Sequence, residues 1–590
     1  MAALFTTPKR NDKTSGAHFV EPDVCRRTLL AHGSWRRVTR RIVVVAVCAL
    51  TVSSLLMPSV SLAAEWVDVG GVRHEAAAGP TGDAAGTWSW DGADDMRLNG
   101  YDGGAIQAAG KLNIAYEGKN TVKTEPDYTG AAIKAQDGTN QKAELNITSS
   151  KSSDELNVTA EADAIKSTGD LSISGPGTVN TTSTSSDGIE AKGDLSITGS
   201  GTVNATGGTE GIQSKGETTI DSSGTVIAKG GEGYGIAAGS DLIIKGGGKV
   251  EASSIEEAAI WADGGINISG GSQVKANSEG DLAVDTEGSL AVTNASLDAT
   301  GVGYGVYTYK GITLDGATVT VRASSDGGEV IALYTDEDDI VIKNGSIVDA
   351  FAEGRLSVAI STRNFNPNEA GGHIYISNSV VKAIARYAET GGDGPDHYST
   401  DQNDGIIPES EGLNIGIYAS THEGITPATI SIVRSKVTAE GDTVAIIALA
   451  MSADGEAIGT IEIKDAIIQT PAGGKVIDYR NKEELSDGIV YEAGQTIGTG
   501  DATIDSPYDQ AVSKSVVIVP PEETKPEEKP GETKPEGTKT TKTVATVATG
   551  VKTTGKLAAT GDASNAAIVA AALAGTAAIA AGAVVSRKRS

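Results

Sequence analysis

The sequence predicts an all-β protein built as a single-stranded parallel β-helix, or β-solenoid. Three observations lead to this prediction. A pattern of apolar residues recurs every 22 to 24 residues, glycine accounts for 75 of the 590 residues, and aromatic residues make up only 4% of the chain. One compact core would need more large side chains, whereas each coil of a repeat protein buries only a thin layer against its neighbours.

Each repeat places an apolar residue six positions before a second apolar residue and eight positions before a third. Because alternate residues of a strand point to the same side, the second and third should both face the core. Thr218 replaces the second apolar residue in one coil. The coils begin at Ile106, Ile165, Ile189, Ile212, Ile236, Ile260, Val284 and Val306. A further apolar residue follows a glycine-rich corner at Val179, Val203, Val226, Val250 and Val274.

A single coil cannot bury its isoleucine and leucine side chains, but a stack of coils buries all of them in continuous columns. Neighbouring coils would lie about 4.8 Å apart and share backbone hydrogen bonds. Burying one such side chain contributes roughly 1.5–3 kcal/mol, which offsets much of the cost of ordering the chain. The alternative is a β-sandwich, whose turns come about every 8–12 residues. The constant period of 22 to 24 residues favours the β-helix.

The later coils keep this pattern but lengthen at one corner. The step from the first apolar residue to the next strand is six residues in the early coils and seven from Leu333 to Ile340. It becomes fourteen, thirteen and fourteen residues from Ile360 to Ile374, from Ile417 to Ile430 and from Ile447 to Ile461. These insertions should stack into one wall, and a second insertion, Arg386 to Gly412, leaves from the opposite corner. We therefore expect a ligand region between about Thr335 and Gly459.

The first 64 residues have the order of a secretory signal peptide. A basic segment, residues 36–41, precedes an apolar segment, residues 42–50, and small residues follow at 61–64. This order predicts cleavage after Ala63 or Ala64. An uncleaved membrane anchor is the alternative, although the apolar segment is shorter than a typical membrane span.

The other end of the chain reads Leu557-Ala558-Ala559-Thr560-Gly561, followed by an uncharged stretch, residues 566–585, and a basic end, residues 587–589. This order resembles the sorting signal of sortase substrates. Ala558 stands where the common pattern has proline, which is similar to the variant used by class E sortases of high-GC Gram-positive bacteria. The resemblance implies cleavage between Thr560 and Gly561 and covalent attachment to peptidoglycan. A plain membrane tail is the alternative, and either would place the protein at the cell surface.

The chain thus divides into six predicted segments. Proline and charged residues make residues 520–556 a disordered, wall-spanning spacer that cannot pack a core. The segments are a signal peptide at 1–64, an N-terminal cap at 65–104, the β-helix at 105–480, C-terminal cap strands at 481–519, the spacer at 520–556 and the sorting signal at 557–590.

The charge of the chain excludes one class of function. The net charge is −29, and the segment 65–560 alone carries 36 basic and 73 acidic residues, a net charge of −37. Such a surface repels nucleic acids and favours divalent cations. The two cysteines, Cys25 and Cys48, lie in the signal peptide, so the processed protein has no thiol for a disulfide or a metal.

Two acidic segments are candidate calcium sites, because Ca²⁺ prefers six to eight oxygen ligands. Asp336, Asp338 and Asp339 form one candidate, and Asp393 and Asp396 form the other. Neither segment has the regular spacing of a known calcium loop. Solvated charges without a metal are therefore the alternative in both places.

Residues 87 to about 480 resemble the carbohydrate-binding domain of secreted bacterial proteins. The segment Thr87 to Gly92 with its two tryptophans, the segment "KLNIAYEGKNTV" and the later Asp-Gly-Ile and Gly-Asp-Leu units carry this resemblance. It implies a right-handed parallel β-helix similar to pectate lyases, binding of polysaccharides, and calcium in the fold. Trp261 follows a core isoleucine, so its ring should point outward, where it could stack on a sugar. The candidate ligand-binding residues are Trp261, Arg363, Tyr418 and His422.

We expect a secreted, wall-attached protein of a Gram-positive bacterium that binds carbohydrate without catalysis, as an adhesin or glycan-binding module. A calcium-dependent polysaccharide lyase on the same scaffold is the first alternative. Such a lyase needs a basic residue as proton acceptor, and the arginines and histidines of the later coils form no recognisable site. A purely structural surface stalk is the second alternative. The sequence predicts neither the glycan nor the oligomeric state.

Overall fold

The computed structural model describes residues 63–126, 128–139, 142–325, 329–364, 371–388, 414–421, 426–450, 459–477, 489–491 and 513–521. The chain separates into two compact units, Met1–Glu523 and Thr524–Ser590, and every described residue belongs to the first. Nearly all of the predicted signal peptide, almost the whole spacer and the entire sorting signal lie outside the described residues. Within the described part of the chain, no helix has both the length and the apolar character needed to cross a membrane.

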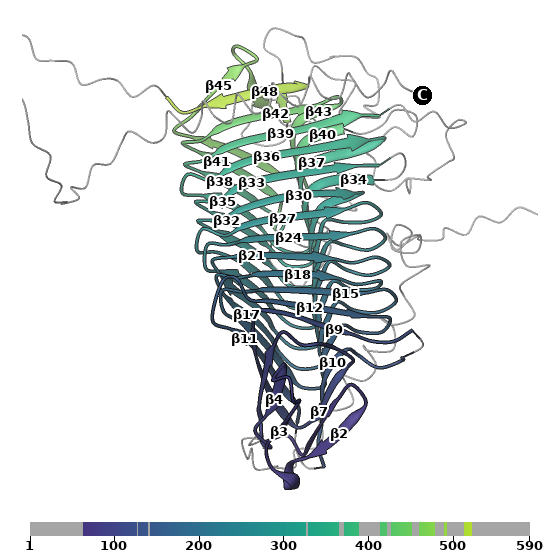
Figure 1. The fold of residues 1–590 in the computed structure, drawn as a ribbon. Coiled ribbons are helices and arrows are strands. Elements are labelled where there is room, and N and C mark those ends of the chain that lie inside the picture. Colours follow the sequence, from purple (N-terminus) through teal and green to yellow (C-terminus); the bar gives the residue numbers. More distant parts are fainter. Residues whose placement is uncertain are drawn as a thin grey trace, which may run out of the picture. The chain divides into compact units, whose positions relative to one another are not determined.

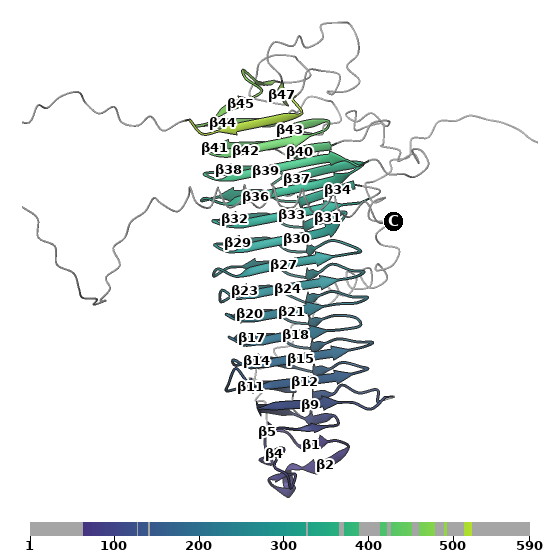
Figure 2. The ribbon, with the colours of Figure 1, turned by 45° about the horizontal axis from the view of Figure 1, so that its top comes forward.

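The described residues form a parallel β-helix, as the sequence predicts. Each coil contributes one strand to each of three sheets, called here sheets A, B and C, and the chain visits them in the order B, A, C (Figure 1). Successive coils pair in parallel, so that the strands of sheet C follow one another as rungs (Figure 2). One short 3₁₀ helix, η1 (Ala76–Ala78), precedes the first coils.

Sheet B begins each coil and carries the first apolar residue of the repeat. Its strands, in order of pairing, are β2 (Val72–Glu75), β1 (Trp66–Val69), β7 (Ile106–Ala109), β10 (Ile133–Gln136), β13 (Ile165–Ser167), β16 (Ile189–Ala191), β19 (Ile212–Ser214), β22 (Ile236–Ala238), β25 (Ile260–Ala262), β28 (Val284–Thr286), β31 (Tyr304–Thr308), β34 (Glu329–Thr335), β37 (Leu356–Asn364), β40 (Asn414–Thr421), β43 (Val444–Ala450), β47 (Ile489–Tyr491) and β46 (Lys475–Ile477).

Sheet A carries the second and third apolar residues of the repeat. Its strands are β3 (Thr81–Gly82), β4 (Trp88–Trp90), β5 (Asp95–Asn99), β8 (Lys111–Glu117), β11 (Glu144–Ser149), β14 (Asp170–Ser174), β17 (Leu195–Gly199), β20 (Thr218–Ser222), β23 (Leu242–Lys245), β26 (Ile266–Ile268), β29 (Leu290–Thr293), β32 (Ile312–Asp315), β35 (Ile340–Lys343), β38 (Ile374–Ser377), β41 (Thr429–Val433) and β44 (Thr460–Lys464).

Sheet C completes each coil. Its strands are β6 (Asp102–Gly103), β9 (Lys119–Lys123), β12 (Glu155–Ala160), β15 (Thr178–Ser183), β18 (Thr202–Thr206), β21 (Thr225–Lys229), β24 (Lys249–Ser254), β27 (Gln273–Ser278), β30 (Ser296–Val302), β33 (Thr318–Ser324), β36 (Ile347–Gly354), β39 (Val380–Tyr387), β42 (Lys436–Gly441), β48 (Ser515–Val519) and β45 (Ile467–Thr470).

The core is a set of columns in which one residue of each coil lies on its counterpart in the next. Ile165 pairs with Ile189 and Ile189 with Ile212, in the register that the repeat predicts. These side chains and their neighbours in the columns are fully buried. Thr218 occupies a leucine position and is also buried, where its hydroxyl contacts that of Ser214 at 2.7 Å.

The structure corrects the repeat in two places. Ile133 begins an additional coil. The predicted repeat omits this coil because Leu145 follows Ile133 by twelve positions and not by six. In β43 the residue in register with Ile417 is Ile446, not Ile447 as the spacing suggested. Ile447 instead lies opposite Tyr418, outside the main core.

Glycine-aspartate pairs recur at the corner between sheets B and A, and contacts between one coil and the next explain why. Oδ1 of Asp170 accepts a hydrogen bond from the backbone N–H of Asp194 at 3.0 Å, one coil later. A Cβ atom at Gly193 would lie 2.1 Å from the same oxygen. Glycine is therefore required before the aspartate, because the carboxylate of the preceding coil occupies the space of a side chain.

Antiparallel strands cover both ends of the stack, where unpaired edges would otherwise favour aggregation. At the start, β1 pairs with β2 and β7, and the antiparallel strands β3, β4 and β5 begin sheet A, where Trp90 is only 1% exposed. At the other end, β48 pairs with β42 in antiparallel orientation and buries Val516 and Ile518.

The long insertions leave the coils where the sequence places them. Chain segments between β37 and β38, β40 and β41, and β43 and β44 connect sheet B to sheet A, and they share one corner. The insertion between β39 and β40 connects sheet C to sheet B and therefore lies at another corner. Most residues of these four insertions lie outside the described residues, so the predicted wall remains a prediction.

Candidate functional site

The outer face of sheet B changes its chemical character along the stack. In each strand, the residue after the first core residue points outward, and pairing of the strands aligns these residues in one column. Charged, polar and small residues occupy the early coils, whereas aromatic residues predominate from β25 onward. The column is Lys166, Glu190, Gln213, Ala237, Trp261, Asp285, Tyr307, Tyr334, Ser361, Tyr418 and Ile447.

Four tyrosines and one arginine form a cluster on this face, called here the tyrosine cluster: Tyr304, Tyr307, Tyr334, Tyr418 and Arg363. The rings of Tyr307 and Tyr334 lie 5.4 Å apart, and Tyr304 lies 5.7 Å from Tyr307 and 5.8 Å from Tyr334. The cluster packs on the outward apolar residues Ile331, Val358, Ile415 and Val444, which form a second core separate from that inside the coils. The outward face thus has an apolar layer of its own.

Arg363 lies over two rings of the cluster. Its guanidinium carbon is 5.7 Å from the ring centre of Tyr334 and 5.4 Å from that of Tyr418. Its Nη2 also donates to Oε1 of Glu329, and Oε2 of the same carboxylate accepts a hydrogen bond from the Tyr304 hydroxyl at 3.3 Å. Burial alone would lower the pKa of Arg363, but attraction to Glu329 raises it well above the ordinary value. The side chain is therefore a permanent cation.

Two carboxylates, those of Asp336 and Glu337, accept hydrogen bonds from tyrosine hydroxyls in and near the cluster. Asp336 accepts from the Tyr334 hydroxyl at 2.9 Å and from the Tyr307 hydroxyl at 3.3 Å. Burial raises the pKa of Tyr334, so this phenol keeps its proton and remains a donor. Nearby, Tyr309 donates to Glu337, and this hydrogen bond together with burial raises the pKa of Tyr309 to about 12.

Two buried polar atoms, one in the tyrosine cluster and one beside it, have no hydrogen-bond partner. These are Oγ of Ser361, whose residue is fully buried, and Nε of Arg363. Ser361 pairs with Tyr334 on one side and with Tyr418 on the other, so both atoms lie in the same part of the outer face. Polar groups without a partner cost free energy, and such positions in native structures require an explanation.

Trp261 lies on the same face, earlier along the stack. It is partly buried, and its ring stacks on that of Tyr234 with centres 5.4 Å apart and planes at 20°. Asp285 separates it from Tyr307 in the column. The Trp261 side chain therefore points outward from sheet B, as the sequence predicts.

The first candidate calcium site does not gather its carboxylates. Asp336 binds the two tyrosine hydroxyls, while Oδ1 of Asp339 accepts from the backbone N–H of His373 at 3.0 Å. Asp338 is exposed, and its Oδ1 accepts from the backbone N–H of Asp339 at 2.8 Å. Among the described residues, these three do not form a group with oxygens within 4.8 Å of one another, although two other groups do. The second candidate, Asp393 and Asp396, lies outside the described residues.

One of those two groups is exposed for the most part and lies near the start of sheet A: Asp91, Asp94 and Asp95. Oδ1 of Asp91 accepts the backbone N–H groups of Ala93 at 2.8 Å and of Asp95 at 3.1 Å. These bonds are those of a turn, and they account for the proximity of the carboxylates without a metal.

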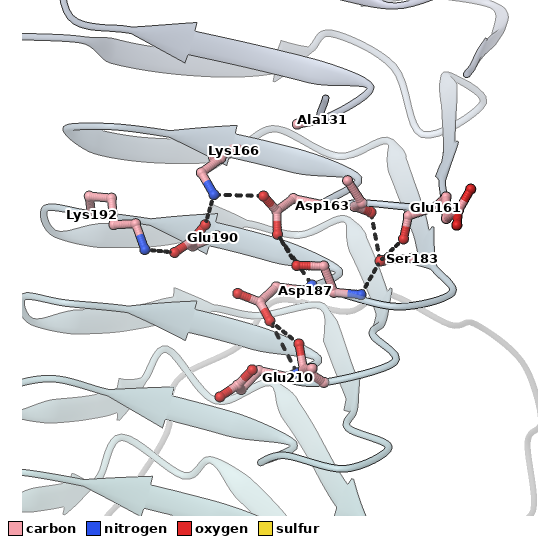
Figure 3. A network of polar contacts seen from close by, with 12 residues as sticks. Ala131, Glu161, Asp163, Lys166, Ser183, Asp187, Glu190, Lys192 and Glu210 are labelled. Atoms are coloured by element: carbon pink, nitrogen blue, oxygen red, sulfur yellow. Dashed lines mark hydrogen bonds and ion pairs between the residues drawn. The ribbon is translucent and has the colours of Figure 1, made fainter. Parts of the chain in front are cut away.

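The second group is buried at the corner between sheets C and B: Asp163, Asp187 and Glu190 (Figure 3). Lys166 donates to Asp163 at 2.7 Å and also pairs with Glu190, so an ammonium group already lies among the carboxylates. Lys192 pairs with Glu190 from the other side. A metal ion here would have to replace these ammonium groups.

Successive coils stack their carboxyl groups in this network. Oδ1 of Asp163 accepts from the backbone N–H of Asp187 at 3.4 Å, and Oδ1 of Asp187 accepts from that of Glu210 at 3.2 Å. Burial alone would raise the pKa of Asp163, but the hydrogen bonds from Lys166 and Ser186 lower it. No lysine forms a salt bridge with Asp187 among the described residues, and burial together with Glu210 raises the pKa of Asp187 to about 8.

A shallow hollow of about 410 Å³ lies on the outer face of sheet A in the early coils. Glu144, Asp170, Asp194 and Glu217 line it, one from each successive coil, together with serine and asparagine side chains. Two of these carboxylates accept the backbone N–H of the next coil, at 3.0 Å for Asp170 and 2.9 Å for Asp194. These carboxylates therefore have a structural role at the corner between sheets B and A. The hollow that they line contains no aromatic side chain.

The structure brings together two of the predicted ligand residues, Arg363 and Tyr418, and places Trp261 on the same face. His422 and the sorting residues Leu557, Ala558, Thr560 and Gly561 lie outside the described residues. The sequence analysis missed Tyr307 and Tyr334. Each follows a core residue, Val306 or Leu333, by one position, as Trp261 follows Ile260, so the rule that placed Trp261 outward would have identified them.

The chain matches no protein-family model, no curated protein and no solved structure.

Proposed function

We propose that the protein is a cell-wall-attached surface protein that binds carbohydrate on the outer face of sheet B and does not cleave it. The observation that carries this proposal is the tyrosine cluster, in which aromatic rings and a fixed cation lie on a sheet face outside the main core. Aromatic rings provide flat apolar surfaces for the carbon-bound hydrogens of sugars, while hydroxyl and carboxylate groups bind sugar hydroxyls. The partly buried rings of Trp261, Tyr304, Tyr307 and Tyr418 are suited to this role.

The arginines of the later coils support binding over catalysis. A lyase needs a group that accepts a proton, whereas Arg363 keeps its charge beside Glu329. Arg386, on sheet C, pairs with Glu440 and with Asp442. Arg434, in the turn between sheets A and C, pairs with Asp465 at 3.1 Å. The three arginines therefore belong to three different parts of the coil.

The location of the protein belongs to the same proposal. The signal peptide at residues 1–64 and the sorting signal at 557–590 would export the chain and join Thr560 to peptidoglycan. The spacer at 520–556 would carry the β-helix through the wall. A surface protein held in this way can display a glycan-binding face to polysaccharides outside the cell.

Retention of the full chain on insoluble polysaccharides tests the proposal. Cellulose, xylan, mannan and pectin would be used, each with Ca²⁺ and with a chelator. The proposal expects retention on at least one polymer, and a marked loss of retention in Tyr418→Ala. Tyr375→Ala is the matched control, because Tyr375 is an exposed tyrosine on the outer face of sheet A.

Two results would contradict the proposal. The first is retention on none of the polymers, which would favour the structural stalk. The second is release of unsaturated products that absorb in the near ultraviolet, which would show a lyase.

A further inference from the structure

The aromatic residues of sheet B lie in a line that follows the stack. Trp261, Tyr307, Tyr334 and Tyr418 all occupy the same outward position, on β25, β31, β34 and β40. Parallel pairing in register places this position directly above its counterpart in the preceding coil. The line of rings therefore runs across the strands, parallel to the axis of the stack. Tyr334 is only 5% exposed and lies beneath its neighbours, so Trp261, Tyr307 and Tyr418 are the rings of the line that a ligand can contact.

The length of this line follows from the spacing of strands. Six strands of sheet B, from β25 to β40, span five steps. Neighbouring strands lie about 4.8 Å apart, so the line is about 24 Å long. One sugar ring of an extended polysaccharide advances by a distance close to one strand spacing. About one sugar for each coil would therefore lie over the column.

The charged side chains beside the line of rings already have partners within the protein. Glu329 pairs with Arg363, and Asp336 accepts two tyrosine hydroxyls. Those three residues lie beside the column, and the one charged residue in the column from β25 to β40, Asp285, is acidic. No described residue of the column from β25 to β40 offers a cation to an acidic sugar, and the acidic chain as a whole repels polyanions.

The unsatisfied atoms lie within the same line. Oγ of Ser361 occupies the column position between Tyr334 and Tyr418, and Nε of Arg363 is two residues further along β37. Both can donate a hydrogen bond, and a neutral sugar offers hydroxyl and ring oxygens as acceptors. Both atoms are buried in the structure, so a ligand would reach them only if neighbouring side chains moved.

We propose that the ligand is an uncharged, extended polysaccharide that lies parallel to the stack axis, from Trp261 to Tyr418, with about one sugar for each coil. This inference rests on the proposed function and adds the class, orientation and length of the ligand. It also assigns Trp261 and Tyr418 to opposite ends of one binding site.

Calorimetric titration of the full chain with cello-, xylo- and manno-oligosaccharides of increasing length tests the inference. We expect affinity to rise with chain length up to about six sugars, the number of coils spanned, and then to level off. Trp261→Ala should weaken binding of the longest oligosaccharides by roughly tenfold, the size of effect expected for one aromatic contact. The same substitution should leave binding of the shortest ones unchanged, and Tyr375→Ala should have no effect on either.

The outcomes separate this inference from the proposed function. Equal affinity for short and long oligosaccharides would overturn the axial site while leaving carbohydrate binding intact. Tighter binding of oligogalacturonate than of every neutral oligosaccharide would overturn the uncharged class. Binding of none of these sugars, with no retention on any insoluble polysaccharide, would overturn both.

Discussion

Replacing Asp187 with asparagine should make the stability of the β-helix less dependent on pH. Asp187 is 6% exposed and lies between the carboxyl groups of Asp163 and Glu210 in neighbouring coils. Its Oδ1 accepts hydrogen bonds from the Thr209 hydroxyl and from the backbone N–H of Glu210. Asparagine keeps this acceptor and the shape of the side chain, and it removes the proton that titrates.

The sign of the effect follows from the direction of the pKa shift. Burial, with Glu210, raises the pKa of Asp187 to about 8 in the folded chain, whereas the pKa of an aspartate in the unfolded chain lies near its ordinary value of 3.8. Between these values the folded state holds a proton that the unfolded state has released. Stability from this group is therefore complete below about pH 4 and falls by up to about 1.4 kcal/mol for each pH unit until the pH passes about 8. By pH 7 the loss has an upper bound of about 4 kcal/mol.

Urea unfolding followed by circular dichroism, at about pH 5 and about pH 8, measures this difference. We expect Asp187→Asn to stabilise the protein by a larger amount at the higher pH. Asp194→Asn controls for removal of one negative charge, because Asp194 is exposed and also accepts a backbone N–H. An equal gain for Asp187→Asn at both pH values would refute the reasoning, since the titration of this carboxyl group would then not contribute.

Three further predictions concern the core, the corners and the attachment of the chain. Thr181→Val should stabilise the fold by about 1 kcal/mol in urea unfolding, because the buried Thr181 hydroxyl has no hydrogen-bond partner; a destabilised variant would show that this hydroxyl is satisfied. Gly264→Ala should destabilise the fold by roughly 1–3 kcal/mol or more, since a Cβ atom would lie 2.1 Å from Oδ1 of Asp241. Gly265→Ala, where the nearest atom would be 3.3 Å away, is the matched control and should have a much smaller effect. Thr560→Ala should leave the protein in the membrane fraction instead of the cell wall, and unchanged wall attachment on cell fractionation would argue against the sorting signal.

The fold was predictable because burial imposes a period on the sequence. Every coil has to supply core residues in the same register, so that the pattern from Ile165 to Val306 is visible without a structure. Where a corner lengthens, as after Ile133, the spacing changes although the register does not, and the coil was missed. The shift from Ile447 to Ile446 has a similar cause, because two adjacent isoleucines can each satisfy the pattern.

The site was less predictable because the types of residue at the outward positions do not repeat from coil to coil. Arg363 and Tyr418 were identified as single residues, but their contact depends on strand pairing across an insertion whose length the core does not determine. The Asp-Gly-Ile unit at Asp187 was visible in the sequence, but nothing in it indicated that the carboxyl group is buried in a network. Its sequence context, a short polar segment before a glycine, is that of an exposed turn, and only stacking of neighbouring coils buries the carboxyl group.

A crystal structure of the protein with the oligosaccharide that binds most tightly is the most direct test of the central claim. The account predicts electron density for sugar rings on the outer face of sheet B, against Trp261 at one end and Tyr418 at the other. Density on sheet A or sheet C, or across a single coil, would contradict it.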